Sequence, residues 1–288
     1  MWVGRDGTTE VVAELYDRVY QDPRLSPDGR RLLLSSYSAG LLVWMLELQR
    51  GTLTRFTTQT GARAFWTSSG DEVVFGSTRN GLWNIYLKPA EGARDAEQLT
   101  SREYRVPSTI SPDGTTILFR TYSARGDHDI GMLTLGSDSG PELLLHTEFD
   151  EHSAMFSPDG RWIAYVSNES GRDEVYVRTF PELQNQTPVS TQGGTEPLWS
   201  RDGAELFYRS PHSMMAVSIT TEPSLILNRP VTLFEDRFVR SGRPWTTYDV
   251  AADGQRFLMM QTRGDGATHQ ISVVLNWFEE LERLVPVE

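Results

Sequence analysis

Charged and polar residues stand four to six positions before each of six similar turn sequences, and they are the residues of this chain best suited to chemistry. They are Asp22, Arg63, Arg105, Glu151, His152, Glu196 and Thr247. Carboxylates bind cations, arginine pairs with carboxylates, and histidine exchanges a proton near neutral pH. If the fold brings these positions together, we expect a site for a small ligand or a peptide terminus. No cofactor is expected there other than a bound divalent cation such as calcium.

The turn sequence that follows these residues recurs along the chain. Its copies begin at Ser26, Thr67, Ser111, Ser157, Ser200 and Ala251. Three copies read Ser-Pro-Asp-Gly, in which proline and aspartate suit the centre of a type I turn and glycine tolerates a positive φ. Successive copies begin 41 to 51 residues apart, a period typical of four short strands per unit. The sequence therefore predicts a six-bladed β-propeller with four-stranded antiparallel blades, starting near residues 22, 63, 105, 152, 195 and 246.

The strands around each turn have distinct patterns. In Trp162–Ser167, apolar side chains fall on both faces of the expected strand, which is typical of a strand buried between two sheets. The fourth strand of a unit is short and polar, as in Glu97–Thr100, and this suits an outer edge that faces water. The strand that leads into the turn is then the innermost one. The candidate site residues therefore lie at the mouth of the central channel.

The sixth unit lacks a fourth strand of its own. Strands are expected at Thr247–Ala251, Arg256–Gln261 and Ile271–Asn276. Residues 1–20 are expected to close this blade, with Val11–Leu15 as its outer strand, because pairing the two ends of the chain removes an open sheet edge. Trp2–Arg5 also resembles a third strand, so an incomplete seventh blade is the alternative.

One segment near the C-terminus has helical spacing. Within residues 277–285, Trp277, Leu281 and Leu284 share a face before Pro286, which predicts a short helix packed on the outside of the propeller. The whole chain, residues 1–288, is then expected to be a single propeller domain. Trp2–Gly7 resembles a strand that begins without any preceding segment, so we expect the chain to come from a longer protein.

The longest connection between turns runs from Thr220 to Trp245. It contains arginines and aromatic residues, namely Arg237, Phe238, Arg240, Arg243 and Trp245. Long loops on a rigid scaffold often bind partners, and such side chains dominate many protein interfaces. A partner-binding loop and a long outer hairpin packed against the ring both remain open.

The amino-acid composition of the chain excludes several classes of binding partner. The formal net charge is −12, from 27 basic and 39 acidic residues, which argues against nucleic acid and against an anionic membrane surface. No apolar run has the length of a membrane span. The chain has no cysteine, which excludes disulfides and thiolate metal sites. We expect a monomer that does not insert into a membrane.

The turns and the third strands together resemble a known family. Third strands such as Asn84–Leu87 and Glu174–Arg178 follow the turns in the order found in TolB-type six-bladed β-propellers, also described as WD-like or PD-type repeats. Phe156–Gly171, Gly193–Ser200 and Val274–Pro286 are similar, more narrowly, to propellers that follow bacterial serine/threonine kinase domains. The resemblance covers nearly the whole chain. It implies an extracytoplasmic sensing or docking module, periplasmic or on the cell surface.

Three functions are open. The leading hypothesis is a non-enzymatic module that binds a protein, a peptide or a small molecule across its channel face, because the scaffold carries no recognisable catalytic motif. The alternative is a lyase or hydrolase acting on an acidic sugar or ester. Its roles would fall to His152 as base, to Arg63 and Arg105 as anion clamps, and to Asp22, Glu151 and Glu196 as cation ligands. A structural spacer or lid for another domain is the third.

Overall fold

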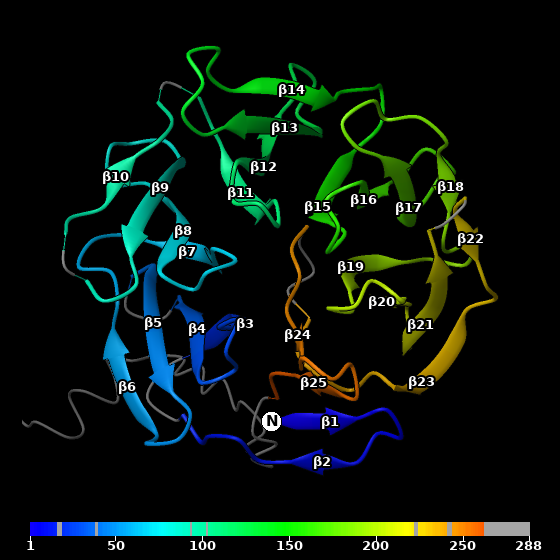
Figure 1. The fold of residues 1–288 in the computed structure, drawn as a ribbon, viewed down its shortest axis with the longest axis horizontal. Helices are drawn as coiled ribbons and strands as arrows, with labels where there is room; N and C mark the ends of the chain where they lie inside the picture. The colour runs from blue at the N-terminus through cyan, green and yellow to red at the C-terminus, as the bar shows by residue number, and fades with distance from the viewer. Residues whose placement is uncertain are drawn as a thin grey trace, which may run out of the picture.

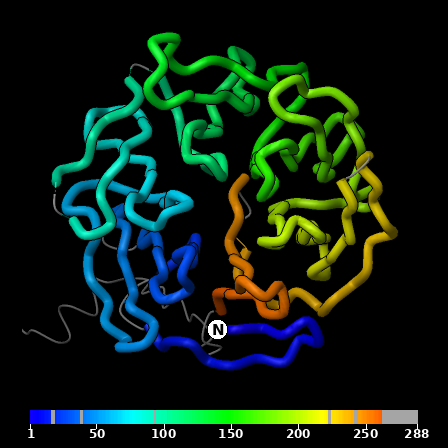
Figure 2. The backbone as a smooth tube through the Cα atoms, viewed as in Figure 1, coloured from blue at the N-terminus to red at the C-terminus, as the bar shows by residue number. Residues whose placement is uncertain are grey.

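The computed structural model contains six sheets arranged as blades around a central axis (Figure 1). The structure describes residues 1–15, 19–37, 40–92, 94–101, 103–221, 224–240 and 244–261. All strand pairs in these sheets are antiparallel, and the first strand of each blade lies nearest the centre of the ring (Figures 1 and 2). This is the six-bladed propeller predicted from the repeat.

Blades 1 to 3 each contain four consecutive strands. Blade 1 consists of β3 (Tyr20–Leu25), β4 (Arg31–Ser36), β5 (Leu42–Glu47) and β6 (Thr52–Arg55). Blade 2 consists of β7 (Ala62–Trp66), β8 (Glu72–Ser77), β9 (Asn84–Pro89) and β10 (Glu97–Gln98). Blade 3 consists of β11 (Val106–Ile110), β12 (Thr116–Tyr122), β13 (His128–Thr134) and β14 (Glu142–Leu145).

Blade 4 keeps this pattern, whereas blades 5 and 6 vary it at their outer edges. Blade 4 consists of β15 (Glu151–Phe156), β16 (Trp162–Ser167), β17 (Glu174–Thr179) and β18 (Thr187–Pro188). Blade 5 consists of β19 (Thr195–Trp199), β20 (Glu205–Arg209), β21 (Ser213–Thr220), β22 (Ile226–Leu227) and β23 (Val231–Glu235). Both β22 and β23 pair with β21, at different places along it. Blade 6 consists of β24 (Asp249–Val250), β25 (Arg256–Leu258), β1 (Trp2–Gly4) and β2 (Thr9–Glu10).

The repeated turn is stabilised by its own side chains. In the copy that joins β15 to β16, the Ser157 hydroxyl donates to an oxygen of Asp159 at 2.5 Å and accepts from the backbone N–H of Trp162 at 3.0 Å. Gly160 has φ 72°, a conformation that residues with a Cβ rarely adopt. The turn also contacts the next blade, because the ring of Pro158 lies against Gly203 of the following copy. The local chemistry therefore fixes both the hairpin and the spacing of neighbouring blades.

The apolar core is divided among the interfaces between blades. One cluster joins Trp162 and Val166 of blade 4 to Trp199 and Leu206 of blade 5. Five further clusters join the other neighbouring pairs of blades in the same way. Each large apolar side chain that is fully buried contributes roughly 1.5–3 kcal/mol. Six such interfaces form a rigid support for the side chains at the centre.

The N-terminal segment closes the ring, but with a different strand from the one expected. β1 pairs with β25 as the third strand of blade 6, and β2 follows as the fourth. The expectation that Val11–Leu15 forms the outer strand is wrong. The chain already turns back at Gly7, with φ 82°, and Asp6 fixes this turn by accepting hydrogen bonds from the N–H and hydroxyl of Thr8 at 3.0 and 2.6 Å. The returning strand therefore ends at Glu10. The six sheets account for every described strand, which leaves none for a seventh blade.

The described ranges contain no helix. The helix expected at residues 277–285 and the strand expected at Ile271–Asn276 lie outside the described residues. No helix long and apolar enough to cross a membrane occurs in the part of the chain that the structure describes.

Candidate functional site

The innermost strands carry an irregularity at the same place in five blades. The pairing of the first two strands shifts register three to four residues before the repeated turn. The residues four positions before the turn are Asp22, Arg63, Pro107, Ser153 and Glu196. All but Pro107 have φ between 53° and 57°, which is unfavourable for a residue with a Cβ. Bulges of this kind redirect a side chain, and here they line the channel.

Asp22 and Arg63 form a buried ion pair across blades 1 and 2. The Tyr37 hydroxyl donates to the second oxygen of Asp22 at 3.0 Å. The backbone N–H of Arg63 donates to the Ser35 hydroxyl at 3.1 Å. Burial lowers the pKa of Arg63, and the charge of Asp22 opposes this effect. The sequence correctly placed these two residues together, and the structure shows that each neutralises the other.

Trp245 lies in the middle of the channel. The guanidinium carbon of Arg63 is 3.4 Å from the centroid of the indole ring, and that of Arg120 is 4.9 Å away. Both contacts have cation–π geometry. A cavity of about 20 Å³ remains, bordered by Trp245, these two arginines, Arg24 and Asp22 among others. A water molecule needs about 10–15 Å³ by this measure, so the cavity admits a single water or a small ion.

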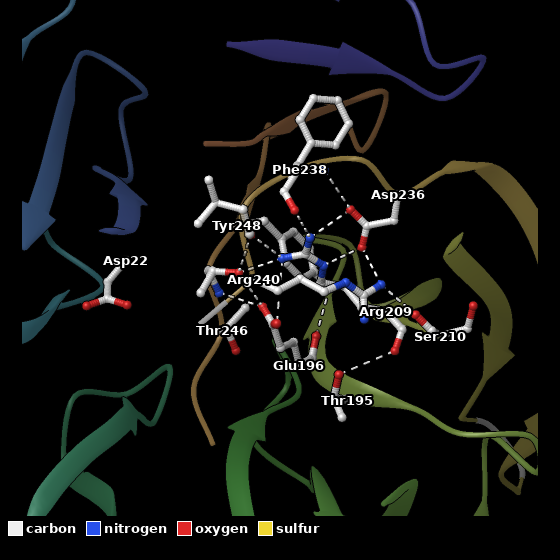
Figure 3. A network of polar contacts seen from close by, with 12 residues as sticks. Asp22, Thr195, Glu196, Arg209, Ser210, Asp236, Phe238, Arg240, Thr246 and Tyr248 are labelled. Carbon is white, nitrogen blue, oxygen red and sulfur yellow. Dashed lines mark hydrogen bonds and ion pairs between the residues drawn. The ribbon is translucent and has the colours of Figure 1, made fainter. Parts of the chain in front are cut away.

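A second polar cluster lies between blades 5 and 6 (Figure 3). Arg209 donates to both oxygens of Asp236, at 2.6 and 2.7 Å, and to the hydroxyl of Thr247 at 2.6 Å. Glu196 lies 3.6 Å from Arg209 and accepts from the N–H and hydroxyl of Thr247 at 2.6 and 2.8 Å. Arg240 also donates to Asp236, at 2.5 Å. Glu196 and Thr247 are therefore neighbours, as expected, but other protein groups occupy their polar atoms.

The electrostatics of this second cluster follow from burial and charge. Burial raises the pKa of Glu196, although the charge of Arg209 opposes it. Burial alone would raise the pKa of Asp236, but the hydrogen bonds and charge of Arg209 outweigh it and leave that pKa lowered. Burial alone would lower the pKa of Arg209, but its hydrogen bonds to Asp236 and the charges of Glu196 and Asp236 outweigh that effect and leave the pKa raised. The cluster is thus balanced internally, which is typical of a structural role.

His152 lies in a dry environment at the start of β15. It is buried, its Nδ1 is 3.0 Å from the Ser153 hydroxyl, and its Nε2 is 3.9 Å from an oxygen of Asp173. Burial lowers its pKa to about 3. A general base works best when its pKa is near the working pH. His152 is therefore poorly suited to the catalytic role that the enzyme alternative gave it.

Arg105 and Glu151 do not join the other candidates. Arg105 donates to exposed Glu103 at 2.5 Å and to the carbonyl of Ser101 at 3.0 Å. Glu151 accepts hydrogen bonds from the hydroxyl and, at 3.2 Å, the N–H of Thr147, and burial raises its pKa. These residues stand six positions before their turns, whereas the bulge lies four positions before. Counting from the turn identifies Pro107 and Ser153 as the equivalent channel residues.

Metal ligation is not evident at the mouth. Among the described residues, no three histidine or acidic side chains gather in a way that could hold a metal ion. The expectation of no cofactor, with a channel-bound divalent cation such as calcium as the alternative, stays a prediction.

The candidate residues of the connection from Thr220 to Trp245 lie in different parts of the structure. Arg237 pairs with Glu235 on the surface, whereas the ring of Phe238 packs edge-on against Phe234 at 6.1 Å. Arg240 belongs to the Arg209 cluster and Trp245 to the channel. Arg243 lies outside the described residues. The connection thus forms the split outer edge of blade 5 and then enters the centre of the ring, as Figure 2 shows for the orange segment.

Several channel residues were missed by the sequence reasoning. They are Arg24, Tyr37, Tyr104, Arg120 and Arg209. A signal for two of them was present, because Arg120 and Arg209 both stand nine residues after the first residue of their turn. They lie near the end of a second strand, whereas the candidate residues all precede the turn, on or beside a first strand.

Five four-stranded blades and one five-stranded blade around a channel lined by bulges define a repeat-built six-bladed β-propeller. The chain belongs to the TolB beta propeller domain family, whose model matches residues 5–176. The recognition of TolB-type repeats in the sequence is thereby confirmed. The narrower resemblance to kinase-linked propellers stays a prediction.

The relatives cover the chain only in part. It is 29% identical to an uncharacterised protein of Agrobacterium fabrum over 67% of this chain and 66% of that protein. It is 24% identical to the Tol-Pal system protein TolB of Francisella tularensis over 64% of this chain and 43% of TolB. The chain therefore spans less than two thirds of the length of either relative.

Solved structures share the fold. One from Agrobacterium tumefaciens, provisionally assigned to TolB, has a TM-score of 0.72 and 20% identity, and the match covers 91% of this chain and 97% of that one. TolB of Acinetobacter baumannii has a TM-score of 0.56 and 24% identity, over 65% of this chain and 47% of that one. At these identities the likeness establishes the fold alone.

Proposed function

We propose that the chain is a non-enzymatic module that binds a protein partner at the channel mouth. The observation that carries this proposal is a run of rings beside blade 3. The ring centroids of Tyr104 and Tyr122 are 4.5 Å apart, those of Tyr122 and His128 5.0 Å, and those of His128 and His152 6.1 Å. Tyr122 is 48% exposed. Tyrosine offers a large contact area together with a polar group, and it is enriched in protein interfaces.

The run of rings is fixed before any partner arrives. An oxygen of Asp150 accepts from the backbone N–H of His128 at 2.9 Å and lies 2.7 Å from its Nδ1. Arg120 donates to the Tyr104 hydroxyl at 3.0 Å. A surface that is already ordered loses little conformational entropy on binding. This favours recognition of a partner over a purely structural spacer.

The relatives point in the same direction. One is named as a component of the Tol-Pal system, and we propose a sensor or docking role of that general kind for this chain. We extend the proposal to an extracytoplasmic location, as the resemblance implies, and to a monomeric domain formed by residues 1–288. The channel face, and not the outer edges of the blades, is the proposed contact surface.

Site-specific photo-crosslinking tests the proposal. A crosslinking amino acid at position 122 is expected to give discrete protein adducts in cells of the organism that encodes the chain. The matched control places it at Leu143, which is 49% exposed on the outer strand β14. Adducts at position 122 should disappear when Tyr104→Ala is added. Equal adducts at both positions, or none at position 122, would contradict a binding surface at the mouth.

A further inference from the structure

Two equivalent arginines have different surroundings in this structure. Arg120 in blade 3 and Arg209 in blade 5 occupy the same position of the repeat, near the end of the second strand. Arg209 is surrounded by Asp236, Glu196 and Thr247. Arg120 is only 3% exposed, and within the described part of the chain its side chain donates one hydrogen bond, to the Tyr104 hydroxyl. Its Nε and Nη1 atoms are buried and have no hydrogen-bond partner among the described residues.

Arg120 borders the cavity beside Trp245. Two other arginines border the same cavity, and each has a stronger set of partners, although the Nε of Arg24 is also buried without a hydrogen-bond partner among the described residues. Arg63 is paired with Asp22. Arg24 donates to three backbone carbonyls, those of Pro23, Thr246 and Tyr248, at 2.6 to 3.0 Å. Among the described residues, Arg120 is thus the cation at this cavity that has neither a paired carboxylate, as Arg63 has, nor backbone carbonyls as acceptors, as Arg24 has.

The charge around the cavity is positive. Three guanidinium groups and one carboxylate, that of Asp22, border a volume of about 20 Å³. Asp22 already accepts hydrogen bonds from Arg63 and, at 3.0 Å, from Tyr37. Repulsion from Arg120 and Arg24 contributes to the lowered pKa of Arg63, after the larger effects of burial and Asp22. A buried cation without a partner is costly, and an anion in the cavity would remove that cost.

We propose that this cavity binds a small monovalent anion, a halide or a carboxylate group, through the guanidinium of Arg120. The cavity is too small for a phosphate ester or a sugar acid, and arginine donors suit carboxylate geometry. The anion has two sources of the same chemistry: a free ion from solution, or an acidic side chain of a bound protein. The second source rests on the proposed function, whereas the first does not.

Thermal unfolding in sodium formate tests the site. The ionic strength is held constant with sodium MES, whose bulky anion cannot enter the cavity. A ligand at ten times its dissociation constant stabilises the native state, and for a chain of this size we expect the midpoint to rise by about 3 °C. Bromide should act like formate and give an anomalous scattering peak beside Arg120 in crystals.

Variants assign the effect to Arg120. The saturable rise should vanish in Arg120→Met and persist, at higher formate concentration, in Arg120→Lys, which keeps the charge. Arg172→Met is the matched control, because this side chain is 63% exposed on another blade. An unchanged formate response in Arg120→Met, or no saturable response in the unmodified chain, would overturn the proposal.

Two model compounds distinguish the sources. Acetyl-glutamate amide carries the carboxylate of an acidic side chain, and acetyl-glutamine amide is its neutral match. If the first also raises the midpoint and the second does not, the site accepts an acidic residue of a partner. If formate acts alone, the site takes a free ion. Either result supports the anion site, and the crosslinking at position 122 tests protein binding separately.

Discussion

Blades 3 and 5 place the same residue type at the same position and use it in opposite ways. In blade 5 the split outer edge returns to the ring and brings Asp236 against Arg209. In blade 3 the outer strand β14 is a single strand, and Arg120 meets an aromatic hydroxyl instead of a carboxylate. The repeat therefore fixes where a buried arginine stands, but irregular connections decide whether its charge is balanced. The balanced arginine holds the structure together, and the unbalanced one is available to a ligand.

The largest expected effect is a difference in the folding stability that the chain loses when each of the two arginines is replaced. Arg209→Met should lower the free energy of unfolding by about 3–5 kcal/mol, because the buried carboxylate of Glu196 loses its cation and that of Asp236 keeps only Arg240. Arg120→Met, measured in the same urea titration without small anions, should change it by less than about 1 kcal/mol. Comparable losses in the two variants would show that Arg120 is satisfied after all.

A second expected effect is a dependence of folding stability on pH, which arises from His152 on the Arg120 side of the channel. Burial lowers the pKa of His152 from 6.5 to about 3, and the charges of His128 and Arg120 add to this effect while Asp150 opposes it. The unfolded chain then binds a proton that the folded chain does not, so stability falls as pH drops below about 6.5. This contribution amounts to about 2 kcal/mol between pH 7.5 and 5.

His152→Gln should remove that dependence. Urea unfolding at pH 7.5 and pH 5 is expected to show a smaller loss for this variant than for the unmodified chain, by about 2 kcal/mol. His212→Gln is the control, because His212 is exposed, and it should leave the difference unchanged. An equal pH dependence in His152→Gln would mean that the buried ring is charged in the native state.

The smallest effect probes the single bond that holds Arg120. Tyr104→Phe removes the hydroxyl that accepts from Nη2 at 3.0 Å and should cost about 1 kcal/mol. Adding 200 mM formate should reduce this loss, because an anion would restore a partner to the guanidinium. Tyr165→Phe is a matched control that removes a hydroxyl bonded to Arg178 at 2.9 Å, far along the chain from the cavity, and formate should not reduce its cost.

Features that depend on residues close together in the sequence could be predicted, whereas contacts that depend on the path of a long connection could not. The turn at Ser157 depends on neighbouring residues alone, so the repeat, the blade count and the antiparallel sheets were predictable. The pairing of Asp22 with Arg63 was predictable because both stand at the same repeat position in adjacent blades. The contacts of Arg209 with Asp236 were not, because they depend on how a long connection folds back.

The position of Trp245 could not be predicted from the sequence either. Its sequence context, beside arginines in the longest connection, left open a partner-binding loop and a long outer hairpin packed against the ring. The chain instead carries it into the channel, where it packs on Arg63 and Arg120. Composition identifies side chains with a capacity for strong contacts, but it does not reveal whether the partner is another protein or the same chain.

The closure of blade 6 has a consequence for how the ring assembles. Val3 pairs with Phe257, and the two residues are separated by nearly the whole described chain. During synthesis β1 and β2 emerge before the other strands of the ring, and the edge of β1 that pairs with β25 stays open until the final blade appears. Such edges can pair with other chains, and contacts this distant in sequence slow folding. A circular permutant opened between blades 2 and 3 would make this blade from continuous sequence, so it should refold faster and aggregate less while keeping the same mature ring.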